Sequence, residues 1–258
     1  MNSAPATNTD KVDAASCRVV GRSETRQDAA STFWLVSLLQ AGDSFYPTGS
    51  YAHSFGLEGL VQAGAVHDRA TLREFLFLSA LPALRHVELP LAAHAYRALA
   101  SPDWARVGEL CVLSSAVKTA SEARQASHNI GRQRAELAAS LHGHPLAVAY
   151  LEHAKAGDGP FSASVSAALE GRVLGAPLEA VMAGVYYAAI GGQLAAAMKI
   201  LRIGQNGCQA LLTEALGRAP EIIAAAEQVT FDEIGWFNPW LDIAAARHET
   251  ADGRLFIS

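Results

Sequence analysis

The sequence predicts an all-α protein, a single compact domain of about ten helices, and three observations support this prediction. Runs that alternate apolar and polar residues with the period of a strand are scarce, and β-branched residues are few. Residues that start and end helices recur along the whole chain. Of the 258 residues 50% are hydrophobic and 17% are charged, which is enough to fill a core.

The first elements follow from their capping residues. Residues 1–30 are small and polar, so we expect a flexible tail, with one domain over residues 31–258. Ser31 or Thr32 is expected to cap a helix that ends near Gly42. A turn and a second helix follow, and Gly64 is expected to end that helix because glycine adopts the left-handed conformation most easily.

Capping residues and prolines also place the next helices. The third is expected to begin at Asp68, or at the capping-box pair Thr71 and Glu74. Pro82 and Pro90 should kink or divide it, because proline lacks the backbone N–H group. Further boundaries are expected at Ser101–Pro102, Gly143–Pro145 and Gly157–Pro160.

A long alanine-rich helix is expected from Pro177 to Gly204. Its uncharged residues 180–198 are long enough to span a membrane. Their apolar content is mostly alanine and glycine, Gln193 interrupts them, and no positive cluster flanks them. We therefore predict a buried core helix. Two shorter helices follow, and an aromatic cluster is also expected in the core: Phe231, Trp236, Phe237 and Trp240.

Charge and cysteine content exclude several classes of protein. The net charge of -5 gives no basic surface for nucleic acid. The three cysteines lie far apart and have no CxxC spacing, so neither a disulfide framework nor a zinc cluster is indicated. We expect a cytoplasmic protein that binds neither nucleic acid nor membrane.

No pattern of catalytic residues is present. There is no GxSxG turn, phosphate loop or dinucleotide fingerprint, and His248–Glu249 lacks the second histidine of an HExxH helix. We therefore predict no catalytic residue. His142 and His144 have the closest histidine spacing and would be the ligands of a metal site, although a closed site needs more donors.

The stretch "DSFYPTGSYAHSFGLEGL" combines glycines with polar residues on an otherwise apolar turn and helix. Gly49 and Gly56 allow a close approach of the backbone, and Tyr51, His53 and Glu58 would present polar groups to a partner. In the alternative interpretation the glycines serve packing within the chain, and His53 is hydrogen-bonded in the core.

A second polar surface is predicted on a helix. Arg124, His128 and Arg132 follow at four-residue steps, so they lie on one face, which Glu136 continues. Such a face is either solvated or a docking strip for an acidic partner.

These motifs resemble the urease accessory protein UreF family. The family signature matches Pro47, Gly49, Tyr51, His53, Ser54, Gly56, Leu57 and Glu58. Three more blocks follow in the family's order: "EARQASHNIG", "MKILRIGQNGCQ" and "LDIAAARHETADGRLFIS".

The resemblance implies a helical, dimer-forming adaptor (chaperone) for metallocentre assembly. It would join UreD (also called UreH) and the GTPase UreG, and present them to apo-urease for GTP-dependent nickel insertion. It implies no bond chemistry and no stably bound cofactor, because nickel is handled by the complex. The implied partner-binding residues are Pro47, Gly49, Tyr51, His53, Ser54, Gly56, Glu58, Arg124, His128, Arg132, Lys199, Gln205, His248, Glu249, Arg254, Leu255 and Phe256.

Two other functions stay open: a nickel-binding metallochaperone that uses its own histidines, and a small helical hydrolase. The C-terminal tail, assigned to residues 241–258, also has two interpretations. Leu255 and Phe256 either dock on the chain's own core, or stay loose until they order on UreD, with charged hydrogen bonds from Arg254, His248 and Glu249.

Overall fold

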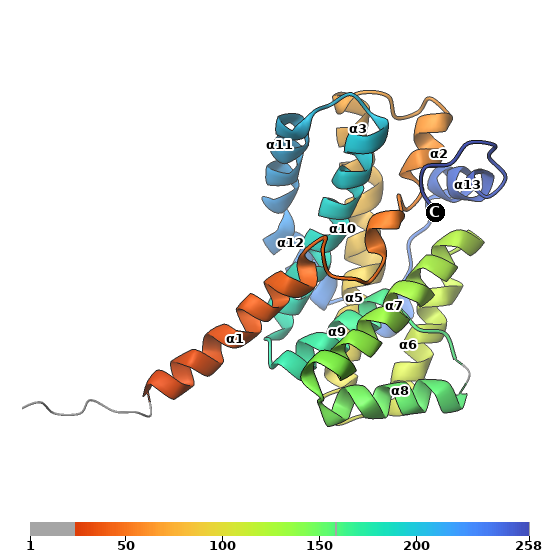
Figure 1. The fold of residues 1–258 in the computed structure, drawn as a ribbon. Coiled ribbons are helices and arrows are strands. Elements are labelled where there is room, and N and C mark those ends of the chain that lie inside the picture. The colour runs from red at the N-terminus through yellow and green to blue at the C-terminus, as the bar shows by residue number, and fades with distance from the viewer. Residues whose placement is uncertain (1–23, 158, 258) are drawn as a thin grey trace, which may run out of the picture.

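A computed structural model describes residues 24–157 and 159–257, and these residues form helices connected by turns, with no strand among them (Figure 1). The predicted all-α fold class is therefore confirmed. Most of the expected N-terminal tail, residues 1–23, lies outside the described residues. The first helix begins at Glu24, so the predicted cap at Ser31 or Thr32 is wrong: the helix runs through both.

The helices follow one another closely along the chain. Their bounds are α1 Glu24–Gly42, α2 Leu57–Gln62, α3 Arg69–Phe75, α4 Leu81–Ala83, α5 Leu89–Ala98, α6 Trp104–Ala116, α7 Ser121–His142, α8 Pro145–Gly157, α9 Ala163–Leu174, α10 Leu178–Ile200, α11 Gln205–Leu216, α12 Ala219–Glu227 and α13 Pro239–His248. Short 3₁₀ turns lie at Ser50–Ala52 and Phe231–Glu233, and π-helical turns at Leu76–Ala80 and Leu84–Glu88.

Most other predicted helix boundaries are confirmed, and two more are shifted. Gly64 has a φ of 72° just after α2, and Asp68 caps α3 by accepting the Thr71 N–H at 2.8 Å. The start predicted at Ser101–Pro102 is wrong, because Asp103 caps α6. Gly204 does not close the long helix, which ends at Ile200, but precedes α11.

Two prolines lie inside one long helical run, Arg69–Ala98. Pro82 and Pro90 each lie shortly after a π-helical turn, at the second position of α4 and of α5. Proline cannot donate the hydrogen bond that a regular helix requires there, and a π turn shifts the bonding pattern. The prolines therefore divide the run without ending it, as the sequence predicted in part.

The core consists of two adjoining clusters of buried side chains. The first joins α2, α3, α10, α11 and α12, and the second joins α5 to α9. By length and composition alone Arg69–Ala98 and Leu178–Ile200 are apolar enough to cross a membrane. Met182, Tyr186, Ile190 and Leu194 of α10 fill the first cluster, as predicted for a core helix.

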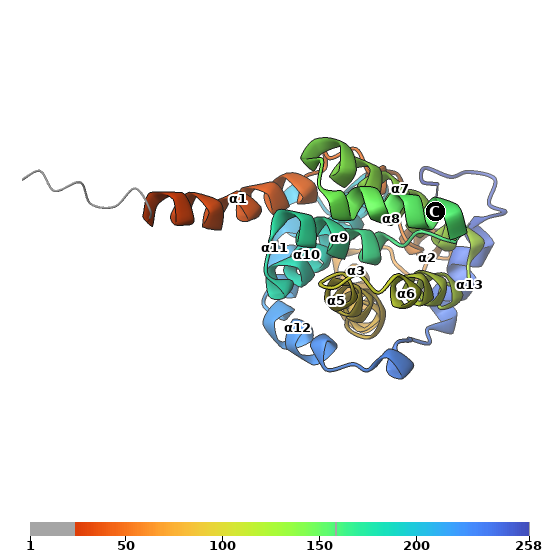
Figure 2. The same ribbon diagram turned by 90° about the horizontal axis from the view of Figure 1, so that it is seen from below.

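The last helix returns to the start of the domain. Helix α13 lies beside α2, and the tail after it runs between α2 and α7 (Figure 1). Residues 241–248 of the predicted tail belong to this helix, so the tail proper begins after His248. Helix α1 contacts α9 and α10 and then leaves the body of the molecule (Figures 1 and 2).

Candidate partner-docking site

Two glycines bring α2 into direct contact with α13. Gly56 has a φ of 88°, and a Cβ at this position would lie 2.6 Å from Cδ1 of Leu241. A Cβ on Gly59 would lie 2.4 Å from the backbone oxygen of Ala244. No larger residue fits at Gly59 without separating the helices, because the atom it would meet belongs to the backbone. The close approach predicted for Gly56 is thus made within the chain.

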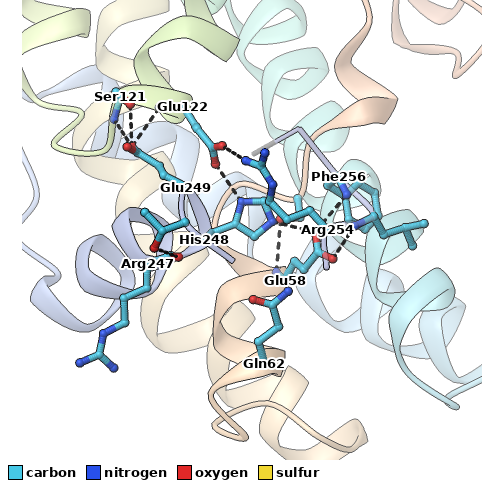
Figure 3. Close-up of polar contacts among 12 residues, drawn as sticks. Glu58, Gln62, Ser121, Glu122, Arg247, His248, Glu249, Arg254 and Phe256 are labelled. Atoms are coloured by element: carbon cyan, nitrogen blue, oxygen red, sulfur yellow. Dashed lines mark hydrogen bonds and ion pairs between the residues drawn. The ribbon is translucent and has the colours of Figure 1, made fainter. Parts of the chain in front are cut away.

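The turn before α2 is also built by local constraints. Phe55 has a positive φ of 51°, uncommon for a residue with a side chain. The Oγ of Ser54 accepts the N–H of Glu58 at 3.2 Å, which satisfies one of the free donors at the start of α2. Ser54 and Glu58 are therefore both buried, and the Glu58 carboxylate is directed toward α13 and the tail (Figure 3).

Four charged side chains from four segments meet here, and we name them the Glu58 cluster: Glu58, Glu122, His248 and Arg254 (Figure 3). The Nε2 of His248 lies 2.8 Å from Glu58, and its Nδ1 lies 2.8 Å from Glu122. Each ring nitrogen of His248 therefore faces a carboxylate oxygen at hydrogen-bond distance. The Nη1 of Arg254 adds a bond of 2.6 Å to Glu122.

The same carboxylate holds the backbone of the tail. Glu58 accepts the N–H of Leu255 at 2.7 Å and the N–H of Phe256 at 3.0 Å. The next N–H, from Ile257, donates to the carbonyl of Ala52 at 2.9 Å. These bonds fix three successive residues on the start of the domain. The tail is thus docked on its own chain, the first of the two predicted arrangements.

Burial of one aromatic ring completes the docking. Phe256 is 5% exposed and belongs to the first core cluster, where the Nζ of Lys199 lies 5.1 Å from its ring centre. Its neighbours Leu255 and Ile257 are 61% and 64% exposed. The chain bends at Leu255 and Phe256, and of these three side chains only that of Phe256 is buried. One side of the tail therefore belongs to the core, and the other faces solvent.

Glu249, the residue after α13, ties that helix to α7. One carboxylate oxygen of Glu249 accepts the Ser121 N–H at 2.8 Å, the Ser121 Oγ–H at 2.7 Å and the Glu122 N–H at 3.4 Å. A carboxylate at a helix N-terminus satisfies free donors and complements the helix dipole. The Ser121 hydroxyl, followed by the backbone donors, holds the pKa of Glu249 below its ordinary value.

The environment of the cluster favours charge on Glu58. Burial alone would raise the pKa of this carboxyl, but the N–H groups of Leu255 and Phe256 and the ring of His248 outweigh it, so the pKa is lowered. His53 has the opposite environment, because desolvation by burial lowers its pKa and disfavours the cation. The charge of the site is therefore concentrated in the Glu58 cluster.

A cavity of about 500 Å³ adjoins the docked tail. Its polar wall comes from α7, where Gln125 and Asn129 are joined by a hydrogen bond of 2.9 Å. The opposite wall is the tail from Arg254 to Ile257, and His53 also lines it. Tail, α7 and the turn before α2 thus form one continuous hollowed surface.

The other predicted partner-binding residues are spread over different surroundings. Pro47, Tyr51 and Gln205 are exposed, and Gly49 has open space around its Cα. The face of α7 that was predicted as a docking strip makes its polar contacts within the chain. The guanidinium of Arg124 donates to the carbonyls of Lys118 and Thr119, His128 accepts the N–H of Phe161 at 3.1 Å, and Arg132 pairs with Glu136.

The predicted core position of the last aromatic cluster is wrong. Trp236 is 41% exposed, Phe237 80% and Trp240 79%, and only Phe231 is partly covered. The loop that carries them is pinned because Gly235 donates to the carbonyl of His86 and Trp236 stacks on the His86 ring. Leu241, Ala244 and His248 occupy the inner face of α13, which leaves the larger aromatic side chains outside.

The described residues bring no set of metal ligands together. Among them, no group of three or more histidine, cysteine, aspartate or glutamate side chains is placed to hold a metal ion. His142 lies in the last turn of α7, and the Nδ1 of the exposed His144 accepts the N–H of Leu146 at 3.1 Å, so this ring caps the start of α8.

Comparisons with known proteins agree with the resemblance seen in the motifs. The model of the UreF family matches residues 66–216, which is more than half of the chain. The chain belongs to the UreF family. It is 30% identical to the urease accessory protein UreF 1 of Brucella melitensis over 227 residues, which are 87% of this chain and 92% of that one.

Two other UreF proteins cover the chain to a similar extent. The urease accessory protein UreF of Arthrobacter sp. (strain FB24) is 28% identical over 89% of this chain and 100% of its own length. That of Bacillus sp. (strain TB-90) is 26% identical over 87% of this chain and 99% of its own. The family name describes an accessory protein of urease, which supports a role in urease maturation.

Sequence reasoning missed several members of the site. Glu122 stood in a motif that we noted, but the residues chosen from that helix were the cationic ones. Gly59, Gln62 and Ala52 carried no signal in one sequence. Their roles arise from contacts with Ala244, Gly253 and Ile257, which lie 185 to 205 positions away along the chain.

Proposed function

We propose that this UreF chain is a non-catalytic adaptor of urease maturation. It joins UreD and the GTPase UreG and presents them to apo-urease in the cytoplasm, with nickel as the cargo of the complex. Membership of the UreF family supports the role in maturation. A surface that couples the state of a GTPase to metal release must contact its partner differently in the two states.

The observation that carries the proposal is the docked tail. Leu255 and Ile257 stay in solvent, although covering each would contribute roughly 1.5–3 kcal/mol. Their backbone is already fixed by Glu58 and Ala52. A surface whose apolar side chains are exposed on an ordered backbone loses little entropy when a partner covers it. We assign this surface, with the adjoining cavity, to UreD.

Reconstitution tests the adaptor function. Purified UreD, UreG and apo-urease are incubated with nickel, bicarbonate and GTP, with and without this chain, and urease activity is measured. We expect activation to depend on the chain, and UreD to elute with it in gel filtration. Equal activation without the chain, and no complex with UreD, would contradict the proposal.

A matched pair of variants tests the assigned surface. The double substitution Leu255→Ser and Ile257→Ser should weaken UreD binding and urease activation while the melting temperature stays unchanged, because both side chains are exposed. Leu141→Ser, at a residue 52% exposed on α7, is the control and should keep full binding. Equal UreD binding by the double variant and the control would show that UreD binds another surface.

A further inference from the structure

The ring of His248 is enclosed between two carboxylates and is only 1% exposed (Figure 3). Its Nε2 lies 2.8 Å from Oε2 of Glu58 on α2, and its Nδ1 lies 2.8 Å from Oε2 of Glu122 on α7. A neutral imidazole carries hydrogen on one ring nitrogen and has a lone pair on the other. A neutral ring between two ionised carboxylates would therefore oppose two lone pairs in one of these contacts.

The other hydrogen-bond donors at the site favour the ionised form of both carboxylates. Arg254 donates to Oε1 of Glu122, and the N–H groups of Leu255 and Phe256 donate to Glu58. Hydrogen bonds to the ionised form of a carboxyl favour ionisation. Burial opposes this at Glu58, but the donors outweigh it and the pKa of that carboxyl is lowered. Both short contacts of the ring are then satisfied only when each ring nitrogen carries a hydrogen.

The remaining charged and titratable groups near the ring have other surroundings. The carboxylate of Glu249 is bonded to Ser121, and the side chain of Arg247 points away from the cluster (Figure 3). His53 lines the adjoining cavity and interacts electrostatically with Glu122, while burial lowers its pKa. The proton that the geometry requires therefore belongs to the ring between the two carboxylates.

We propose that docking of the C-terminal end of the chain, residues 248–257, is coupled to one proton held by His248, so that a rise in pH releases this segment. When the ring loses that proton to solvent, its contact with Glu58 or Glu122 becomes repulsive. Glu58 also accepts the N–H groups that fix the tail, so the loss of the ring contact weakens the hold on the whole segment.

The direction of the pH dependence follows from the number of protons bound in each state. An imidazole in water gives up its second hydrogen at about pH 6.5, so above this pH a released His248 is neutral. A docked state that holds one more proton is disfavoured as the pH rises, by up to about tenfold for each unit. In acid, protonation of Glu58 weakens docking as well. Docking is therefore strongest near neutral pH.

Nitrogen NMR of the histidine rings in the full chain at pH 7 tests for the proton directly. We expect the ring of His248 to carry hydrogen on both nitrogens. This measurement uses the wild-type chain, so it does not depend on the stability of any variant. A His248 ring with a single hydrogen at pH 7 would overturn the proposal.

Hydrogen exchange of the tail amides measures docking. The N–H groups of Leu255 and Phe256 are bonded to Glu58, and that of Ile257 is bonded to the carbonyl of Ala52. Their protection, corrected for the intrinsic exchange rate at each pH, should fall by up to about tenfold for each unit between pH 7 and pH 9. Constant protection over this range would contradict the coupling.

An amide elsewhere and two variants are the controls. The N–H of Arg106 also donates to a carboxylate, that of Asp103 at 3.0 Å, and its protection should stay constant. His248→Gln keeps a donor but cannot titrate, so it should abolish the pH dependence. His144→Gln, at an exposed histidine, should keep it. A dependence that persists in His248→Gln, with circular dichroism showing a folded chain, would assign the proton to another group and overturn the proposal.

The consequence for UreD rests on the proposed function, because it requires that UreD binds the docked tail. UreD affinity, measured by calorimetry at each pH, should then fall in proportion to the docked fraction given by the tail amides. Full affinity at a pH at which the tail is released would remove UreD from this surface and keep the proton coupling. The NMR and exchange measurements use the chain alone, so their failure would leave the adaptor function intact.

Discussion

The Glu58 cluster and the α1–α10 faces differ in how much of their surface the chain satisfies by itself. In the cluster, each of the four side chains has a partner of the opposite type, acidic or basic, within 3 Å. The space beside the neighbouring Gly56 and Gly59 is occupied by α13. Around α1 and α10, large apolar side chains are exposed, and the glycines face open space. The first region is completed within the chain, whereas the second stays exposed on the single chain.

The difference predicts where a change affects folding and where it affects association. Buried ion pairs leave an uncompensated charge when one member is removed, so changes in the cluster should reduce the free energy of unfolding. Exposed apolar residues contribute little to the stability of the single chain. Changes at the exposed positions of α1 or α10 should therefore have smaller effects on the stability of the single chain.

Removal of residues 254–258 should have the largest effect on stability. It exposes the groove that Phe256 fills and removes two N–H donors from Glu58 and the cation beside Glu122. We expect a loss of about 5 kcal/mol, given that Phe→Ala in a core costs about 3–5 kcal/mol and that buried charges lose partners as well. Urea unfolding measures it. An unchanged midpoint would show that the tail is loose on the isolated chain.

Paired glycine substitutions compare the two regions directly. Gly59→Ala should destabilise the chain by about 1–3 kcal/mol, because its Cβ would overlap the Ala244 carbonyl. Gly184→Ala should stabilise it by about 0.5–1 kcal/mol, because alanine is the better helix former. Both are measured by chemical unfolding. Equal effects of the two substitutions would abolish the distinction between the regions.

The lowered pKa of Glu58 predicts a dependence of stability on pH. A carboxyl whose pKa is lower in the folded state contributes stability above its unfolded pKa, and this contribution is lost as the pH falls through the folded value. Urea unfolding between pH 7 and pH 3 should therefore show a loss of stability that Glu58→Gln lacks. Glu109→Gln, at an exposed ion pair, should keep the full wild-type loss. Identical pH profiles for wild type and Glu58→Gln would show that Glu58 does not cause this loss of stability.

The smallest effect is expected in the exposed aromatic loop. Trp240→Ala should change the free energy of unfolding by less than about 0.5 kcal/mol, as is usual for surface positions, whereas a buried tryptophan would cost about 3–5 kcal/mol. Thermal unfolding checks this expectation. A large loss of unfolding free energy would show that Trp240 is buried, as the sequence predicted.

The sequence predicted the helices well because their signals are local. Asp68 before an apolar run and Gly64 after one act through neighbouring residues, so one sequence is sufficient to locate them. The positions of Trp236, Phe237 and Trp240 were predicted wrongly for the opposite reason. Hydrophobicity does not show which face of α13 the body covers, and that is decided by Gly56 and Gly59, far away in the chain.

The candidate site could be predicted only in part. The motif analysis singled out Glu58, His248 and Arg254 one by one, through the family resemblance. Their assembly was not predictable, because Glu58 and His248 lie 190 positions apart and Glu122 comes from a third helix. A buried carboxylate that accepts two backbone N–H groups has no local pattern in sequence.

The central claim is that the Glu58 cluster holds the tail as the surface for UreD. The most direct test is calorimetric titration of UreD into Glu58→Gln at a temperature at which circular dichroism shows this variant to be folded. Glu109→Gln is the matched control. We predict that UreD binding and urease activation fall for Glu58→Gln as far as for the chain lacking residues 254–258, and that the control binds like wild type. Full UreD affinity in Glu58→Gln would contradict the account.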